Sequence, residues 1–470
     1  MNAAKIKQDG GTYTMTTVNN NLDTDRLLSR EELVNQGYPF GKVNDFIPFG
    51  NPQNEWMRSE PNVKVFIPEK DGGDNCDNCV LAVTATPDGK ELIAVWTQSS
   101  VEGRGNNRIV LSRTNDGENW TYPQPIVGTY TVGEAQSSWG MPMFSKSGRL
   151  YMMYLQGAEP DRQDPGMPGC LNGDLALMYS DDLGHSWSAP RILPLPRCDF
   201  DNPNENIAKN WWNQQQPIRD AKDRLVCGFT MKRSPSLGEL VNYPHEVTKI
   251  AFLCFENLDE DPEIEDIRFV IEPENGLCVT DPLFPENSVA QEASPVLLPD
   301  GRMFSTMRTI TGYIYYTVYE NGTWRETAPM IGHDGNPVPH PLGPCPMFSL
   351  EDGRYLCVFY NNPGKRLGYD SNGYPMMAQG MNVTRGPLHL MLGHFDPKSK
   401  QPIRFGKPLK FIDTDCVALG MYKQCCTAPS YVALTQWKGK TMLWYPDRKY
   451  NILGKEITPE ILQKLEDGLD

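Results

Sequence analysis

The chain has 470 residues, and its 59 acidic and 44 basic side chains give a formal net charge of −15. Because the lysines and arginines form no runs, this balance excludes a protein that covers nucleic acid or an anionic membrane with a broad basic face. The chain has no apolar stretch long enough to span a bilayer and opens without a signal-peptide core, so we expect a cytoplasmic protein, or a secreted or periplasmic one if a signal has been removed.

Helical signals occur at the two ends of the chain. Ser29 and Glu32 form a capping box, in which each side chain accepts a hydrogen bond from the backbone of the other residue. Near the other end, Thr458 stands directly before a proline, which is typical of a helix start. We therefore predict an N-terminal arm with a short helix over 1–60 and a C-terminal helix over 456–470.

Between these ends, a tight turn followed by an apolar strand recurs six times. Each turn is of the Asp-Gly type or close to it, and the apolar, β-branched and aromatic residues that follow predict an antiparallel hairpin. Such a unit cannot bury both faces of its sheet alone and must stack against its copies. We predict an all-β fold, a six-bladed β-propeller of four-stranded antiparallel blades over 61–455. The six turns lie at 87–90, 147–149, 222–224, 299–302, 351–354 and 438–440.

A second turn motif occurs in the second repeat, where residues 180–187 read Ser-Asp-Asp-Leu-Gly-His-Ser-Trp. In this pattern Asp182 is placed to accept backbone N–H groups across its own turn. Gly184 supplies a positive φ, and Trp187 packs on the next strand. Less complete copies occur in the first and fourth repeats. We interpret these motifs as structural and assign them no catalytic role.

The spacing Ser-x-Asp-x-Gly-x-x-Trp resembles the Asp-box, or BNR, repeat of the sialidase (neuraminidase) superfamily. Together with the hairpins, the likeness extends from about residue 75 to about residue 450. The resemblance implies a hydrolase that removes a terminal acidic sugar from a glycan, without a cofactor. It also implies a site in which three arginines bind the sugar carboxylate, a tyrosine paired with a glutamate attacks the anomeric carbon, and an aspartate acts as acid and base.

The fourth repeat resembles the family segment that holds the glutamate and one of the arginines. Glu292 begins the innermost strand, whose residues face the central funnel of a propeller, and Arg308 follows on the next strand. The alternative is a solvated carboxylate with a structural ion-pair partner. Arg385 resembles a second arginine of the family, and its guanidinium suits a carboxylate because it donates two parallel hydrogen bonds. Its alternative is an exposed strand position.

The sequence departs from the family where the third arginine and the acid are expected. The segment 74–80 before the first hairpin contains no arginine, and Arg58 lies further upstream, where we expect a surface position. After the second strand of the first repeat, Glu102 takes the place of the family's aspartate. Glu102 can act as acid and base only if its pocket raises its pKa toward neutrality.

The inner strand of the sixth repeat carries the candidate nucleophile, Tyr431. Tyr431 is one residue away from the family position, and strand alternation would then turn its ring to the opposite face. Tyr445 is the second candidate, and Arg448 is a candidate for an additional anion contact.

Two further side chains precede inner strands, Trp139 and Gln215. They are candidates for sugar stacking and hydroxyl recognition if they line the funnel rather than pack between blades. The pair Cys76 and Cys79 has the spacing of metal ligands, but no second such pair follows, so we expect no metal site.

These features lead to one hypothesis and two alternatives. The hypothesis is a sialidase-like exo-glycoside hydrolase, whose partner is a glycan with a terminal acidic sugar. The alternatives are a non-catalytic propeller that binds glycans or proteins, and a glycosidase or lyase of different specificity on the same scaffold. The sequence predicts neither the sugar nor an oligomeric state.

Overall fold

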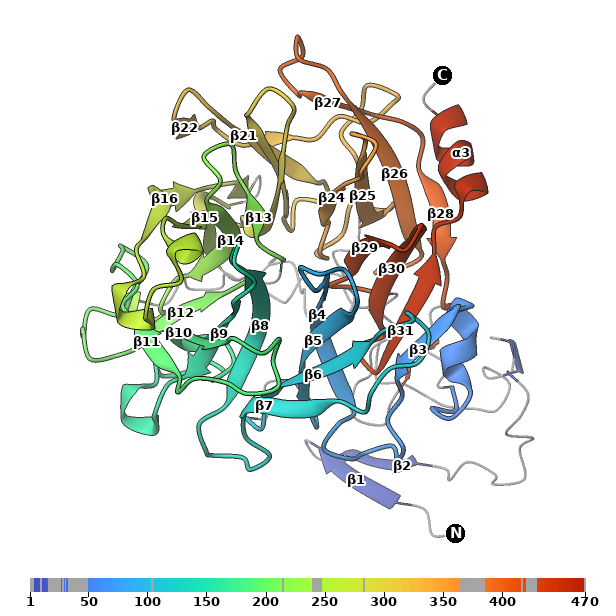
Figure 1. Ribbon diagram of the computed structural model, residues 1–470. Coiled ribbons are helices and arrows are strands. Elements are labelled where there is room, and N and C mark those ends of the chain that lie inside the picture. Colours follow the sequence, from blue (N-terminus) through green and yellow to red (C-terminus); the bar gives the residue numbers. More distant parts are fainter. Residues whose placement is uncertain are drawn as a thin grey trace.

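The computed structural model describes residues 4–8, 11–15, 27, 29, 31–32 and 50–468, except 103–104, 214, 239–246, 282–283, 364–384, 416 and 420–428. Its sheets are arranged around a common centre, and their order around the ring follows the chain (Figure 1). The predicted all-β fold and β-propeller arrangement are confirmed.

Four sheets of four or five strands stand separately in the ring. Each is antiparallel, as the hairpin pattern predicts. Their strands are β4 (Asp77–Ala85), β5 (Leu92–Ser99), β6 (Arg108–Thr114) and β7 (Gln124–Gly128); β19 (Gln291–Leu297), β20 (Met303–Arg308), β21 (Tyr315–Glu320), β22 (Thr323–Trp324) and β23 (Ala328–Pro329); β24 (Met347–Ser349), β25 (Tyr355–Tyr360), β26 (Leu388–Phe395), β27 (Ile403–Phe405) and β28 (Leu409–Ile412); and β29 (Ala433–Trp437), β30 (Lys440–Asp447), β31 (Asn451–Glu456) and β3 (Val63–Phe66).

The predicted separation into six blades differs from the observed hydrogen bonding, because one nine-stranded sheet stands where the second and third blades were expected. Strand β12 pairs with both β10 and β14 and joins the two halves. The Asn172 side chain on β10 holds β12 in place, since its Nδ2 donates to Ala208 O at 2.9 Å and to Asn210 Oδ1 at 2.9 Å. The strands are β8 (Ser137–Phe144), β9 (Leu150–Gly157), β10 (Asn172–Ser180), β11 (Arg191–Leu193), β12 (Lys209–Trp212), β13 (Ile218–Arg219), β14 (Leu225–Lys232), β15 (Thr248–Phe255) and β16 (Phe269–Leu277).

The six predicted turns adopt the backbone conformation that their residues favour. Each has a residue with positive φ at the equivalent position, where Asp223 takes the place that glycine occupies in the other five, and in the sixth turn Lys438 also has positive φ (49°). These residues are Gly89 (φ 68°), Gly148 (102°), Asp223 (65°), Gly301 (86°), Gly353 (85°) and Gly439 (78°).

The Asp-box turn also forms as predicted. Asp182 Oδ1 accepts the Ser186 backbone N–H at 2.8 Å, and Ser180 Oγ accepts that of Gly184 at 2.7 Å. In the first repeat, Asp116 Oδ1 likewise accepts two backbone N–H groups at 2.8 Å. The tryptophan of that turn, Trp120, packs edge-on against Trp444 of β30 at 5.1 Å between ring centroids. These motifs therefore fix strand ends and help join neighbouring sheets.

The ring is closed by pairing of distant parts of the chain. Strand β3 precedes the first hairpin but pairs with β31 near the C-terminus (Figure 1). Buried side chains of the first and last sheets, among them Trp96 and Trp444, form one hydrophobic cluster across this closure. Closing this junction carries a large loop-closure entropy cost, because its two sides are separated by nearly the whole sequence.

The predicted C-terminal helix forms, whereas the predicted helix of the N-terminal arm lies mostly outside the described residues, which show only its capping box. Ser29 N–H donates to Glu32 Oε2 at 2.8 Å and Glu32 N–H donates to Ser29 Oγ at 3.1 Å, which completes the capping box. Helix α3 (Pro459–Asp467) starts after Thr458, whose side chain accepts from Ile461 N–H. The remaining elements are β1 (Ala4–Gln8), β2 (Gly11–Met15), β17 (Thr280–Asp281), β18 (Phe284–Ser288) and the 3-10 helices η1 (Glu55–Ser59), η2 (Pro160–Arg162), η3 (Pro235–Leu237), η4 (Leu258–Glu260) and η5 (Ile264–Asp266).

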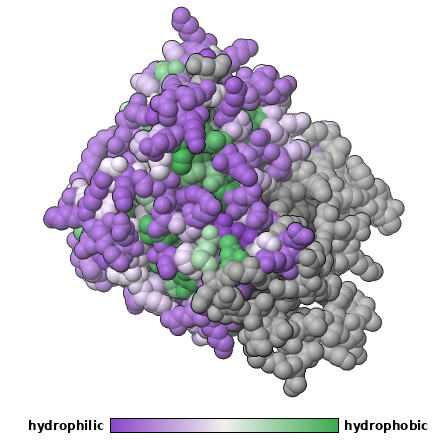
Figure 2. Space-filling view, turned by 90° about the vertical axis from the view of Figure 1, so that its right-hand side faces the viewer, coloured by the Kyte–Doolittle hydropathy of each residue, from purple (hydrophilic) through white to green (hydrophobic). Residues whose placement is uncertain are grey.

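The outer surface is mainly polar. In Figure 2, hydrophobic residues appear as small groups between hydrophilic ones on the face that it shows. No helix in the described part of the chain has the length and apolar character needed to cross a membrane.

Candidate active site

A recurring bulge positions the residues at the centre of the ring. At the start of four inner strands, one non-glycine residue has positive φ: Val80 (55°), Trp139 (63°), Glu292 (54°) and Tyr431 (60°). The strand register shifts beside the first three of them. A threonine hydroxyl of the preceding sheet accepts the bulge N–H in two cases, from Trp139 at 2.7 Å and from Glu292 at 2.9 Å. Bulges of this kind redirect one side chain at a strand end.

Glu292 lies in a buried environment at this bulge, and its side chain is fully shielded from solvent. Its Oε1 is 2.9 Å from Arg308 Nη1 and accepts a hydrogen bond from Trp212 Nε1 at 3.3 Å. Oε2 is buried and has no hydrogen-bond partner among the described residues. Burial raises the pKa of Glu292, although Arg308 and Arg385 oppose the shift. A carboxylate with one unused oxygen and a raised pKa is suited to accept a proton.

Arg308 connects Glu292 with Tyr431. Its Nη1 also donates to the Tyr431 hydroxyl oxygen at 3.2 Å, and its Nε donates to Gln291 Oε1 at 2.7 Å. The Tyr431 hydroxyl and the Glu292 carboxylate therefore contact the same nitrogen of Arg308, although simple strand alternation predicts that the Tyr431 ring points to the opposite face. Tyr431 has positive φ and lies two residues before β29, so the alternation of that strand does not determine its orientation.

Arg385 approaches the same centre from the start of β26. Its Nε donates to Leu342 O at 2.7 Å, and it forms no ion pair with any described carboxylate. The loop that holds it depends on buried His340, whose Nε2 donates to Gly343 O at 2.7 Å while its Nδ1 accepts the Tyr360 N–H at 3.3 Å. Burial lowers the pKa of His340 to about 4, so the ring stays neutral at pH 7.

A third cation, Lys449, reaches this centre from the turn after β30. Its Nζ is 5.3 Å from the centroid of the Tyr431 ring and forms an ion pair with Glu102. Burial alone would lower the pKa of Lys449, but the charges of Glu102 and nearby groups raise it well above its usual value. Asp77 holds the Glu102 loop, since its Oδ2 accepts the Glu102 N–H at 2.6 Å. Lys449 was not among the site residues predicted from the sequence.

The position of Arg448 differs from its predicted role as an anion contact. It is fully buried and paired with Asp447 Oδ2 at 2.8 Å and with Glu55 Oε2 at 2.7 Å. Arg58 is also buried rather than on the surface, with Glu55 Oε1 at 2.7 Å and Asp415 Oδ2 at 3.2 Å. Arg448 therefore holds η1 against the turn after β30 through Glu55, and Arg58 links η1 to Asp415 in the segment after β28.

Tyr445, the second candidate nucleophile, is fully buried next to this network and shares a hydrogen bond with Ser59 Oγ at 2.9 Å. Burial raises its pKa well above the usual value of 10.0. A phenol this difficult to ionise, and already bonded to the N-terminal arm, is a poor nucleophile. Among the two candidate tyrosines, only Tyr431 contacts Arg308.

Trp139 and Gln215 lie between sheets rather than on an open surface. Trp139 is 1% exposed and its Nε1 donates to Cys170 O at 2.6 Å, so both its ring and its polar atom are occupied. Gln215 is 5% exposed, and its Nε2 has no hydrogen-bond partner among the described residues. Trp212, which the sequence analysis interpreted as packing, is the indole that contacts Glu292.

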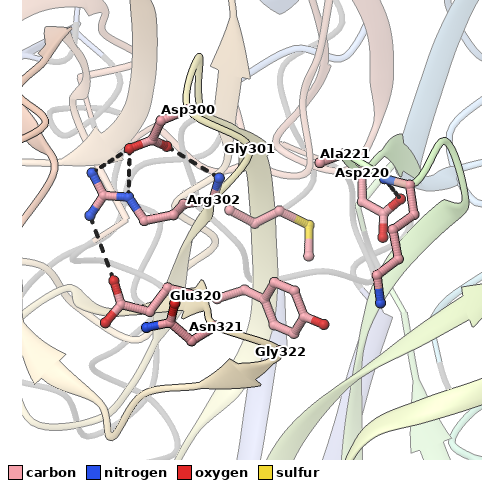
Figure 3. Close-up of a pocket in the computed structure, with 11 residues that line it drawn as sticks. Asp220, Ala221, Asp300, Gly301, Arg302, Glu320, Asn321 and Gly322 are labelled. Carbon is pink, nitrogen blue, oxygen red and sulfur yellow. Dashed lines mark hydrogen bonds and ion pairs between the residues drawn. The ribbon is translucent and has the colours of Figure 1, made fainter.

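A separate groove of about 510 Å³ lies between the turns of two neighbouring sheets, away from these residues (Figure 3). Several of its charged side chains are paired: Arg302 binds Asp300 Oδ2 at 2.7 Å and lies 3.8 Å from Glu320 Oε2, and Asp220 Oδ1 accepts the Lys222 backbone N–H at 2.9 Å. Among the described residues, no three His, Cys, Asp or Glu side chains are grouped to hold a metal ion.

Residues 90–415 match the BNR repeat-like domain family. The chain belongs to this family. The matched range contains Glu292, Arg308 and Arg385, whereas Tyr431 and Lys449 follow it. The match confirms the relation to BNR-repeat proteins that the Asp-box motif predicts.

Solved structures with the same propeller arrangement include sialidases and a protein of unknown function. The intramolecular trans-sialidase from Ruminococcus gnavus is 13% identical, with a TM-score of 0.54 over 85% of this chain and 98% of that chain. The protein of unknown function from Dyadobacter fermentans is 13% identical, with a TM-score of 0.53 over 84% and 97%. The NanB sialidase from Streptococcus pneumoniae is 11% identical, with a TM-score of 0.52 over 87% and 71%. No curated protein sequence matches this BNR-repeat protein.

Proposed function

We propose that this BNR-repeat protein is a sialidase-like exo-glycoside hydrolase that removes a terminal acidic sugar from a glycan. The observation that carries the proposal is the meeting of Glu292, Arg308 and Tyr431, in which one guanidinium nitrogen contacts both the carboxylate and the phenol. A neutral phenol is a suitable nucleophile for an acidic sugar, because a carboxylate nucleophile would be repelled by the charge of the substrate.

We further propose that the ring functions as six units over 61–455. In this interpretation the nine-stranded sheet acts as two blades that share β12. Support comes from its two antiparallel ladders, β8 to β11 and β13 to β16, because each contains one of the six predicted turns. The proposal assigns each remaining turn to one of the four separate sheets.

The three cations give the proposed site its preference for an anion. Arg385 is the strongest candidate for a bidentate carboxylate contact, because it has no carboxylate partner among the described residues. Arg308 donates to the Tyr431 hydroxyl, and Lys449 Nζ lies 5.3 Å from the centroid of the Tyr431 ring. We propose that Lys449 supplies the third positive charge, in place of the arginine that the first repeat lacks.

In the proposed first step, the Tyr431 oxygen attacks the anomeric carbon, its proton passes to Glu292, and the bond to the leaving oxygen breaks, with that oxygen taking a proton from solvent water. In the second step the hydroxide left by that water attacks the anomeric carbon, the bond from the sugar to Tyr431 breaks, and Glu292 returns the proton to the Tyr431 oxygen. Arg308 stays bonded to both partners, so the exchange of charge between them takes place beside a fixed cation. Glu102 forms the ion pair that orients Lys449. We propose this orienting role for Glu102 instead of the acid role, because an ion-paired carboxylate carries no proton to donate.

Arg385→Met tests the anion site directly. We expect the kcat/KM for a fluorogenic sialoside to fall about 10- to 100-fold through a higher KM, because one charged hydrogen-bond partner of the carboxylate is lost. Arg404→Met removes an exposed arginine of β27 and is expected to leave the kinetics unchanged. The panel should also include other nonulosonyl, uronyl and neutral glycosides. Equal hydrolysis of neutral glycosides would contradict the proposal, and binding of sialosides without hydrolysis would establish the binding propeller instead.

The pH dependence of kcat/KM tests Glu292 as the base. Activity should fall as the pH drops through the Glu292 pKa, and this acid limb should lie above the usual value of 4.5 because burial raises that pKa. Trp212→Phe removes the indole N–H that donates to Glu292 Oε1. This hydrogen bond stabilises the ionised carboxylate, so its loss should raise the Glu292 pKa and move the acid limb to higher pH. Trp211→Phe is the matched control, because its Nε1 donates to Gly173 O instead. An acid limb that stays in place in Trp212→Phe would exclude Glu292 as its source.

A further inference from the structure

Arg108, the first residue of β6, is buried and forms no ion pair with a described carboxylate, although Tyr130 and Asp74 act against the fall in its pKa. It is 1% exposed, and its Nη2 donates to Gln98 Oε1 at 2.8 Å and to Asp74 O at 2.9 Å. Both acceptors are uncharged carbonyl groups. Its Nε and Nη1 are buried and have no hydrogen-bond partner in the described part of the chain. Two nitrogens of a buried, permanently charged group therefore have no hydrogen-bond partner among the described residues.

Such an arrangement is unfavourable unless a negative charge enters it. Burial lowers the pKa of Arg108, but a guanidinium cannot escape the cost by losing its proton, as a buried lysine can. Buried charges in proteins are normally paired or bound to a ligand. No carboxylate of the described residues forms an ion pair with Arg108. The buried arginines Arg58 and Arg448 each have at least one such partner.

One aromatic side chain covers this charge. The ring centroid of Tyr130 lies 3.9 Å from Arg108 Cζ, yet Tyr130 is 53% exposed, so the far face of the ring is open to solvent. Tyr130 belongs to the connection between β7 and β8, which has Gly128 and Gly133 on either side of it, both with positive φ. Nearby Val132 is 64% exposed. A side chain with so few neighbours can rotate away and open the guanidinium to a ligand.

Strand register places Arg108 at the same end of its sheet as the proposed active site. Arg108 pairs with Gln98 on β5, and Gln98 pairs with Asn78 on β4. The Asn78 N–H donates to Lys449 O at 2.9 Å. Because neighbouring strands lie about 4.8 Å apart, Arg108 is about 10 Å outward from the inner strand.

We propose that Arg108 and Tyr130 form a second anion-binding subsite, which takes a carboxylate or sulfate group carried by the glycan beyond the sugar that is removed. The oxyanion accepts hydrogen bonds from Nε and Nη1, and Tyr130 moves aside to admit it and packs against the attached sugar ring. That a glycan carries this anion depends on the proposed function. That an anion binds here depends only on the environment of Arg108.

Thermal unfolding in the presence of free anions tests the subsite without any assay of hydrolysis. The titrations use sodium sulfate and sodium acetate separately, with sodium chloride keeping the ionic strength constant, so that the two oxyanions are distinguished. All proteins carry Arg385→Met, which weakens anion binding at the central site. On this background we expect at least one of the two anions to raise the Tm saturably by about 3 °C.

Arg108→Met should remove this response. In the absence of oxyanion it should also leave the Tm equal or higher, because an apolar side chain of similar length replaces an unpaired buried charge. Tyr130→Ala, which removes the cover and keeps the cation, should reach half of the full response at a lower anion concentration. A response in Arg108→Met equal to that of its parent would overturn the proposal, as would the absence of any response in the parent. If Arg108→Met does not fold, the proposal would be overturned by a Tyr130→Ala protein that needs the same anion concentration as its parent to reach half of the full Tm response.

Discussion

Glu292→Gln is expected to lower kcat for an acidic glycoside by about 10³-fold, within the range that general bases contribute. Glutamine preserves the shape of the side chain and an oxygen that accepts from Arg308 and Trp212, both of which contact Oε1. What it lacks is the ability to take the proton of Tyr431. The expected result is therefore a loss in kcat with little change in KM, measured as initial rates at saturating and subsaturating substrate.

Glu272→Gln is the matched control for this substitution. Glu272 is also paired with an arginine, Arg224 at 2.9 Å, but it lies on β16, an outer strand of the nine-stranded sheet. Its replacement should leave kcat unchanged. Both variants should keep the native near-ultraviolet circular dichroism, which separates a loss of chemistry from a loss of fold. A Glu292→Gln protein with native kcat would remove Glu292 from the mechanism.

Part of the cluster of Glu292, Arg308 and Tyr431 was predictable, because local signals place Glu292 at the start of an inner strand. Glu292 and Arg308 lie on either side of one predicted turn, so their pairing follows from a single hairpin. The orientation of Tyr431 was not predictable in this way. It depends on a positive φ at Tyr431, just before β29, and the sequence offers no glycine or Asp-Gly signal to mark it.

Long-range pairing accounts for the residues that sequence reasoning misplaced. Arg448 resembles an available anion contact until its partner Glu55 is identified, and the two are 393 positions apart in the chain. Lys449, the next residue, was missed because it lies in the turn after β30 rather than on an inner strand. Its partner Glu102 is 347 positions away. Single-sequence patterns contain no information about such contacts, since they arise only when the ring closes.

The same closure joins the proposed site to the stability of the molecule. Arg448 and Lys449 are consecutive in the turn after β30, and both have positive φ. Arg448 binds the N-terminal arm through Glu55, and Lys449 reaches Tyr431 and Glu102. The arm network therefore fixes the turn from which Lys449 extends. A weakened arm is expected to affect both folding and the position of the third cation.

Glu55→Gln is expected to lower the free energy of unfolding by about 3 to 5 kcal/mol at pH 7, because it leaves two buried guanidinium groups facing an uncharged amide. Glu55 is 1% exposed, and its two oxygens accept from Arg58 Nη2 at 2.7 Å and from Arg448 Nη1 at 2.7 Å. The measurement is denaturant unfolding of the native chain and the variant. The slope of the free energy of unfolding against denaturant concentration should be the same in both.

The pH dependence of this difference identifies its source. Burial alone would raise the pKa of Glu55, but Arg58 and Arg448 bring it below its usual value of 4.5. Because the folded pKa is the lower one, the carboxylate contributes its full stability above the unfolded pKa and loses it as the pH falls through the folded value. The difference in the free energy of unfolding between the native chain and Glu55→Gln should therefore become smaller below about pH 4.5.

Glu60→Gln provides the control, since Glu60 has an 85% exposed side chain that lies 3.5 Å from Lys455. Its replacement should change the free energy of unfolding by about 0.5 kcal/mol or less, both at pH 7 and below about pH 4.5. If Glu55→Gln behaved like this surface variant, the ion network would add nothing to closure of the ring. The pairing of β3 with β31 and the packing between the first and last sheets would then have to hold the arm and the turn at Arg448 by themselves.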